Sequence, residues 1–168
     1  RWDNESEFPL QAIQQAHELG LTNLHIPEEY GGPGMGVLEE AIVSEEMSWG
    51  DPGFGTAQYS NGLTAAPIIT GGTEEQKKKY LGMLAEKPLI AAYCVTEPGA
   101  GSDVSSIKTS AVLKDDHYIL NGSKMWITGA GQAEWFFVLA YTDRDKGYRG
   151  MSAFIVESKW DGVCLLYT

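Results

Sequence analysis

The sequence changes character at residues 88–104, which read PLIAAYCVTEPGAGSDV. Residues 89–95 form an apolar run of the length of a buried strand, and a glycine-rich loop follows directly. Before this stretch apolar residues recur at helical spacing, whereas after it short alternating runs are separated by turn signals. We therefore predict an α+β chain with a helical domain at residues 1–88 and a middle β-domain, cut short, at residues 89–168.

Helices are expected before this stretch. The helical pattern occupies residues 10–21, 38–49 and 54–70 and a segment that starts at Thr73. Thr73 and Gln76 have the spacing of a capping box, which marks a helix start. In the second helix the spacing predicts a core-facing side made of Leu38, Ala41, Ile42 and Trp49.

Strands are expected after it. Besides the run at 89–95, the pattern is found at residues 107–114, 117–121, 123–128, 135–142, 151–156 and 163–167. Asp115-Asp116 marks a turn, and Asn121-Gly122 is the strongest hairpin signal, suited to a type I′ turn. Since no helical pattern separates the strands, we predict an antiparallel β-barrel domain, incomplete in this chain.

Composition excludes several classes of protein. The 168 residues carry 12 basic and 23 acidic side chains, a net charge of −11 that argues against nucleic-acid binding. No apolar run reaches the ~20 residues of a membrane helix, so we expect no membrane span. The three histidines lack metal-ligand spacing, and the two cysteines form no disulfide framework, so no metal site is predicted.

The glycine-rich loop is the first candidate site. Its glycines do not mark a Rossmann fold, because strand-like residues 107–114 follow where that fold needs a helix. Small residues allow a ligand to approach the backbone closely, and Thr96 and Ser102 add hydroxyl groups. This suits a polar ring edge or a pyrophosphate. Composition alone favours an ordinary Gly-Pro turn.

The second candidate site is Met125-Trp126-Ile127-Thr128. On a strand, residues two apart point to the same side, so Trp126 and Thr128 would face either one ligand or the core. Aromatic side chains in strands usually pack in cores, and taken alone the segment favours that interpretation.

Four ordered stretches together resemble the acyl-CoA dehydrogenases and cover nearly the whole chain. They are NLHIPEEYGGPGMG (23–36), EEQKKKYLGML (74–84), YCVTEPGAGSDV (93–104) and NGSKMWITGAG (121–131). The third stretch and KKKYLG are most similar to the medium-chain branch. The resemblance implies an FAD enzyme with N-terminal helices, a middle β-barrel and a C-terminal helical bundle.

The resemblance also implies a set of cofactor-binding residues. They are Tyr93, Val95, Thr96, Gly101, Ser102, Trp126, Ile127 and Thr128. Trp126 would cover one face of the flavin, and Thr128 would bond near its reactive nitrogen. Ser102 would also contact the thioester arm of the substrate. Tyr59, a second substrate-binding residue, stands where medium-chain relatives have an acidic residue at the end of the acyl pocket, which predicts a reshaped pocket.

The implied reaction is the α,β-dehydrogenation of a fatty acyl-CoA in fatty acid β-oxidation, with electron-transferring flavoprotein taking the electrons. The family's glutamate base lies beyond the middle domain, so no residue here is assigned as catalytic, and we expect Glu97 to shape its loop. The 168 residues alone should show weak or no FAD binding and no turnover. The full-length protein would be a homotetramer in the mitochondrial matrix of a eukaryote or the cytoplasm of a bacterium.

Two alternatives remain open. The first is an acyl-CoA oxidase or flavin monooxygenase on the same fold. The second is a non-catalytic protein, truncated or acting in assembly. The stretches TEPGAGSD and MWIT together favour the dehydrogenase.

Overall fold

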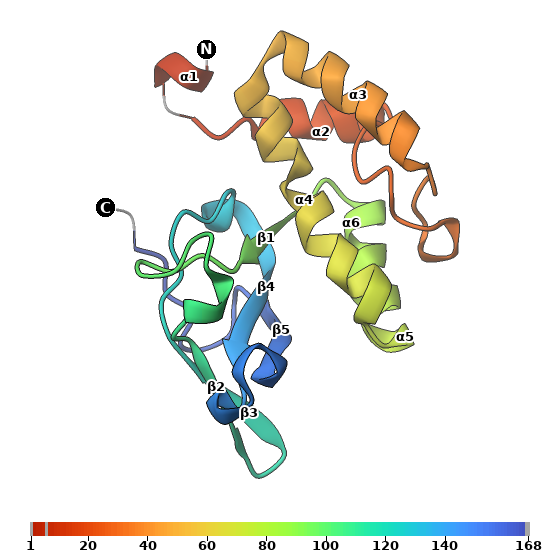
Figure 1. Cartoon of the computed structure of the whole chain (residues 1–168). Helices are drawn as coiled ribbons and strands as arrows, with labels where there is room; N and C mark the ends of the chain where they lie inside the picture. The colour runs from red at the N-terminus through yellow and green to blue at the C-terminus, as the bar shows by residue number, and fades with distance from the viewer. Residues whose placement is uncertain (1, 6, 167–168) are drawn as a thin grey trace. The chain divides into compact units, whose positions relative to one another are not determined.

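The computed structural model describes residues 2–5 and 7–166. It contains two compact units, which divide between Ala91 and Ala92. The first, the helical unit, holds the helices α1 to α6, and the second, the strand unit, holds most of the strands (Figure 1). This order of helices and strands confirms the predicted fold class. No helix in the described part of the chain has the length and apolar character needed to cross a membrane.

The helical unit begins with short helices and is built around one long one. Its elements are α1 (Trp2–Glu5), α2 (Leu10–Glu18), η1 (Glu28–Tyr30), α3 (Val37–Gly50), α4 (Pro52–Gly71), α5 (Glu74–Gln76), a π-helical segment η2 (Lys77–Leu81) and α6 (Gly82–Glu86). Asp51 caps α4, since its Oδ1 accepts a hydrogen bond from Phe54 N at 2.8 Å. The capping box of Thr73 and Gln76 is present at the start of α5, as predicted.

Buried polar side chains of α4 hold the strand that leads to the candidate site. Asn61 Oδ1 accepts from Ala91 N at 2.8 Å, and Asn61 Nδ2 donates to Leu89 O at 2.9 Å. Thr64 Oγ1 donates to Ala91 O at 3.4 Å. The helix thus supplies the backbone of the first strand with hydrogen bonds that a neighbouring strand would otherwise provide.

The predicted core-facing side of α3 is wrong. Leu38 is 70% exposed and Trp49 is 89% exposed, and Ala41 and Ile42 are exposed as well. None of the helix's residues is buried in the described structure. Helical spacing identifies an apolar side of a helix, but it contains no information on whether another element covers that side.

The strand unit is built mainly of antiparallel pairs. Its elements are β1 (Ile90–Cys94), which begins in the helical unit, η3 (Val104–Ser106), β2 (Ser110–Lys114), β3 (His117–Asn121), η4 (Ala130–Gln132), β4 (Ala133–Tyr141), η5 (Arg144–Gly150) and β5 (Met151–Glu157). The sheet order is β1-β4-β2-β3, with β5 also pairing with β4. β2 and β3 are antiparallel, as are β4 and β5, whereas β2 meets β4 at one parallel bridge between Ser110 and Tyr141.

The hairpin turn predicted at Asn121-Gly122 is wrong. β2 and β3 pair Lys114 with His117, so Asp115-Asp116 is the turn that joins them, and Asp115 has a left-handed φ of 56°. Gly122, which follows β3, is required for a reason other than a hairpin turn. A Cβ there would lie 2.2 Å from Thr109 Oγ1, so only glycine permits this close approach of the two backbones.

Two predicted strands are absent from the described residues. Residues 123–128 form an irregular loop in which Trp126 has a φ of 59°. Residues 163–166 are also irregular, while Tyr167 lies outside the described residues. Both segments are rich in apolar residues, but neither pairs with a strand in the described part of the chain.

Candidate functional site

Two loops of the strand unit carry the predicted cofactor residues other than Tyr93, which lies in β1. We call residues 95–109 the Val95 loop and residues 122–132 the Trp126 loop. Met125 N donates to Thr96 O at 2.9 Å, which ties the second loop to the first. This bond shows that the two loops meet, and it places Trp126 one residue away from the contact with Thr96.

Trp126 is presented by a turn and not by a strand. Its φ of 59° is rare for a bulky residue, and its side chain is 84% exposed. The loop continues with Ala130 N donating to Ile127 O at 3.2 Å and with Gly129 in the left-handed region. Thr128 is exposed as well. Strand periodicity therefore gives no reason for Trp126 and Thr128 to face the same ligand, although both side chains are exposed.

Tyr93 and Val95 differ in what they can offer a ligand. The ring of Tyr93 is partly exposed and stacks on Phe137 of β4, with centroids 5.0 Å apart and an interplanar angle of 4°. Val95 is buried, and its carbonyl oxygen accepts from Lys124. Any contact of Val95 with a ligand would therefore involve its remaining backbone atoms.

Gly101 and Ser102 lie at the exposed tip of the Val95 loop. Just before them, Glu97 and Ala100 exchange two backbone hydrogen bonds of 2.9 and 3.1 Å. Just after them, the carboxylate of Asp103 accepts from the hydroxyls of Ser105 and Ser106, and these bonds lower its pKa below the usual value. The Ser102 hydroxyl is thus carried on a loop tip that is fixed on both sides.

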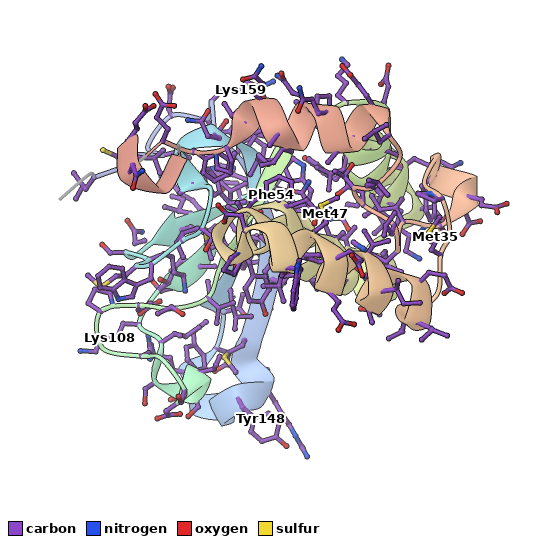
Figure 2. The ribbon with its side chains drawn as sticks, turned by 90° about the horizontal axis from the view of Figure 1, so that it is seen from above. Met35, Met47, Phe54, Lys108, Tyr148 and Lys159 are labelled. Atoms are coloured by element: carbon purple, nitrogen blue, oxygen red, sulfur yellow. The ribbon has the colours of Figure 1, made fainter. Side chains whose placement is uncertain are left out.

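The hydrogen-bonding capacity of the Glu97 carboxylate is taken up by groups of the protein itself. It accepts from Lys108 N at 2.5 Å, from Thr109 N at 3.0 Å and from the Thr109 hydroxyl. Burial raises its pKa, but hydrogen bonds from Lys124, Thr109 and Lys108 outweigh burial and lower the pKa to about 2. The side chain of Lys108 itself points outward from the loop (Figure 2). The expectation that Glu97 shapes its loop is confirmed.

Lys124 is the partner of Glu97, and the sequence analysis did not single it out. Its ammonium group donates to Glu97 Oε1 at 2.8 Å, to Leu139 O at 2.8 Å and to Val95 O at 3.1 Å. Both charged side chains are nearly buried, at 11% and 5% exposure. One signal in the sequence could have found the pair. The stretch YCVTE (93–97) has Glu97 as its one charged residue, and NGSK (121–124) has Lys124, so the two motifs carry opposite charges near their starts.

Tyr59 belongs to the helical unit. Its hydroxyl donates to Glu40 O of α3 at 2.9 Å, and burial raises its pKa above the usual value. The ring is half-buried, and the bond to Glu40 O holds it in one orientation.

The residues of the two loops, together with Tyr93 of β1, fit a flat ring with a polar edge. Trp126 and Tyr93 offer aromatic surfaces, and Thr96, Ser102 and Thr128 offer hydroxyl groups. Two open hollows of about 460 and 300 Å³ lie elsewhere, on the helical unit, lined among others by Tyr30 and by His17. No cluster that could hold a metal ion occurs among the described residues.

Comparisons with known proteins identify both units. Residues 1–88 match the family model "Acyl-CoA dehydrogenase, N-terminal domain", and residues 92–165 match "Acyl-CoA dehydrogenase, middle domain". The chain is 51% identical over 166 residues to a probable medium-chain specific acyl-CoA dehydrogenase of Caenorhabditis briggsae, named as mitochondrial. That match covers 97% of this chain and 41% of the relative. The chain spans about two fifths of the length of the curated relatives it matches.

Solved structures agree with these matches. An acyl-CoA dehydrogenase of Bacillus anthracis, complexed with FAD, superposes with a TM-score of 0.82 at 42% identity, covering 91% of this chain and 26% of that one. The prolyl acyl carrier protein oxidase AnaB superposes with a TM-score of 0.89 at 36% identity, covering 95% and 43%.

Proposed function

Because the chain belongs to the acyl-CoA dehydrogenase family, we propose that its strand unit binds FAD and that it works within an FAD-dependent acyl-CoA dehydrogenase. The reaction is the removal of two hydrogens across the Cα–Cβ bond of a fatty acyl-CoA, as in β-oxidation. FAD, when bound, supplies the acceptor for the hydride. The observation that carries the proposal is the 2.9 Å bond from Met125 N to Thr96 O, which joins the two loops with the predicted ring contacts.

Each loop has a separate task in this proposal. The exposed indole of Trp126 covers one face of the flavin ring, and burial of that large apolar surface favours binding. The hydroxyls of Thr96 and Thr128 donate to the polar edge of the ring. Tyr93, braced by Phe137, limits access of water from the sheet. Gly101 and Ile127 contribute backbone contacts at the two ends of the site.

Two further residues, one in each unit, are proposed to contact the substrate. Ser102 orients the thioester arm of the acyl-CoA through its hydroxyl at the loop tip. Tyr59 shapes the end of the acyl pocket, and its bond to Glu40 O prevents the ring from moving aside for a longer chain. We propose that this tyrosine restricts the length of the acyl group.

The base that removes the α-proton is not among the carboxylates of the Val95 loop. Glu97 is held by four donors and Asp103 by two serine hydroxyls, and a base must be free to reach the proton. We therefore expect the purified 168-residue chain, mixed with FAD, a dye and acyl-CoA thioesters of several lengths, to reduce no dye. Turnover at the rate of a typical dehydrogenase would show that a base lies within these residues.

FAD binding is tested by titrating the 168-residue chain with FAD and following the flavin absorbance and fluorescence. We expect weak but saturable binding. Trp126→Ala should weaken it by about tenfold or more, since ring stacking contributes about 1 kcal/mol beyond the buried area. Trp160→Ala is the matched control, because Trp160 is a half-exposed tryptophan of the same unit outside both loops. Equal affinities of the two variants would overturn the proposal.

An acyl thioester oxidase is the second candidate, supported by the similarity to a carrier-protein oxidase. The two functions differ in the acceptor that reoxidises the flavin, electron-transferring flavoprotein for the dehydrogenase and molecular oxygen for the oxidase. After photoreduction of the bound FAD, faster electron transfer to the flavoprotein than to oxygen supports the dehydrogenase. The reverse order supports the oxidase.

A further inference from the structure

Lys124 uses its whole hydrogen-bonding capacity to join distant parts of the strand unit. An ammonium group has three N–H donors, and its three acceptors are the carbonyl of Val95, the carboxylate of Glu97 and the carbonyl of Leu139 on β4. No N–H remains for a ligand. Any influence of Lys124 on a bound molecule must therefore pass through the backbone of its own loop.

Glu97 extends this connection to a further segment. Its carboxylate binds the backbone N–H groups of Lys108 and Thr109 immediately before β2, while it also binds Lys124. One nearly buried ion pair thus links the end of β1, the entry to β2, the middle of β4 and the Trp126 loop. Such a pair is strongly coupled to its surroundings, because removal of one partner leaves an unpaired charge in a poorly hydrated place.

Trp126 lies two residues beyond Lys124 in a backbone conformation that local forces do not favour. A left-handed φ costs a non-glycine residue about 1–2 kcal/mol, and such strain persists only where the surroundings impose it. The indole is 84% exposed, so packing of the side chain itself does not impose it. On its N-terminal side the loop is held by the three bonds of Lys124 and the bond from Met125 N to Thr96 O. On its C-terminal side Ala130 N donates to Ile127 O at 3.2 Å.

We propose that Lys124 is a positioning residue that holds Trp126 in its left-handed conformation, so that the aromatic surface is in place before any ligand binds. The proposal rests on the proposed function only where it identifies that ligand as FAD. A surface that is already ordered loses less conformational freedom on binding, and the affinity is higher for that reason. Lys124 would therefore raise the affinity for FAD without touching it.

The test has a readout that needs no cofactor. The chain has five tryptophans, and labelling with 5-fluorotryptophan gives each a separate fluorine resonance, with Trp126 assigned by its loss in Trp126→Phe. In the FAD-free protein, Lys124→Met should shift or broaden the Trp126 resonance. The matched control is Lys146→Met, which breaks the exposed ion pair with Asp143 at 3.0 Å and should leave Trp126 unchanged.

A second variant keeps the test decisive if Lys124→Met fails to fold. Glu97→Gln removes the charge of the partner while it keeps a carbonyl oxygen, and Lys124 retains its bonds to Val95 and Leu139. We expect a smaller displacement of the Trp126 resonance in the same direction. An unmoved Trp126 resonance in every folded variant of the pair would overturn the proposal, whatever happens to FAD binding.

The FAD arm separates positioning from general stability. Lys124→Met should weaken FAD binding by about tenfold in the parent chain, the effect expected from lost preorganisation, but by no more than about twofold in a chain that carries Trp126→Ala. The same factor in both backgrounds would show that Lys124 acts only through overall stability and would contradict the proposal. If the 168-residue chain binds no FAD, the fluorine resonance decides the role of Lys124 by itself.

Discussion

Helix α3 and the Val95 loop keep their shapes by different means. In α3 the hydrogen bonds close within the helix, and none of its residues is buried. In the Val95 loop, by contrast, Glu97 is 7% exposed and gathers donors from Lys108, Thr109 and Lys124. The helix is held mainly by its own backbone, with added bonds from Tyr59 to Glu40 O and between His25 and the Glu40 carboxylate. The loop is held by side chains that are distant in sequence. Single substitutions should therefore matter far more in the irregular segment than in the regular one.

The largest effect is expected for Glu97→Leu. This change leaves the Lys124 ammonium unpaired and the Lys108 and Thr109 N–H groups without acceptors, so the free energy of unfolding should fall by about 3–5 kcal/mol. Urea denaturation followed by circular dichroism measures it. Asp116→Leu is the control, because that carboxylate is exposed and pairs only with His117. A loss below about 1 kcal/mol for Glu97→Leu would remove the difference between loop and helix.

The next effect is a pH dependence. The pKa of Glu97 is about 2 in the folded state, and an unfolded glutamate has a pKa of about 4.3. The stabilisation from the ionised pair is therefore complete above about pH 4.3 and is lost as the pH falls toward 2, by up to about 3 kcal/mol.

Urea midpoints check this loss when they are measured from about pH 5, above the unfolded pKa, down to about pH 2, at the folded pKa. The free energy of unfolding should decline less steeply in Glu97→Gln than in the unsubstituted chain. Parallel curves for the two proteins would mean that Glu97 titrates normally and that the ion pair is not formed in solution.

A smaller effect is expected at the start of α4. Asp51→Ala removes the side-chain acceptor of Phe54 N and should lower the free energy of unfolding by about 1 kcal/mol. Asp51→Asn keeps an acceptor oxygen and should lose much less. Similar losses in the two variants would argue that charge, and not the capping bond, is what Asp51 contributes.

The smallest effect is expected on α3. Ile42 is 54% exposed, so Ile42→Gln should change the free energy of unfolding by no more than about 0.5 kcal/mol. Thermal or urea denaturation measures it against the unsubstituted chain. A loss of about 2 kcal/mol would show that this side of α3 is covered in solution, and the comparison between helix and loop would fail.

Sequence reasoning succeeded where structure is set by local pattern. The capping box of Thr73 and Gln76, the long helix α4 and the strands β3 to β5 follow from residues within one element. It failed at Trp126, because the apolar and β-branched residues of MWIT suit a strand as well as they suit this turn. The contact that decides between them, Met125 N to Thr96 O, joins residues far apart in the sequence.

The remaining errors have the same physical origin. Asn121-Gly122 has the composition of a hairpin turn, yet Gly122 is required by the close approach of Thr109. By its immediate neighbours in the sequence Lys124 does not differ from an exposed lysine, whereas in the structure its ammonium group donates to the carbonyl oxygens of Val95 and Leu139. The motifs led to the two loops that the structure brings together, whereas the contacts that hold these loops in place could not be predicted from the sequence.

The claim that Trp126 forms the flavin surface is tested most directly by the fluorine resonances of the 5-fluorotryptophan-labelled chain during a titration with FAD. Stacking on the flavin would shift the Trp126 resonance by ring current, and the shift should saturate with the change in flavin absorbance. The resonances of Trp49, on the exposed side of α3, and of Trp160 should stay in place. Saturation of the flavin signal with an unmoved Trp126 resonance would contradict the account.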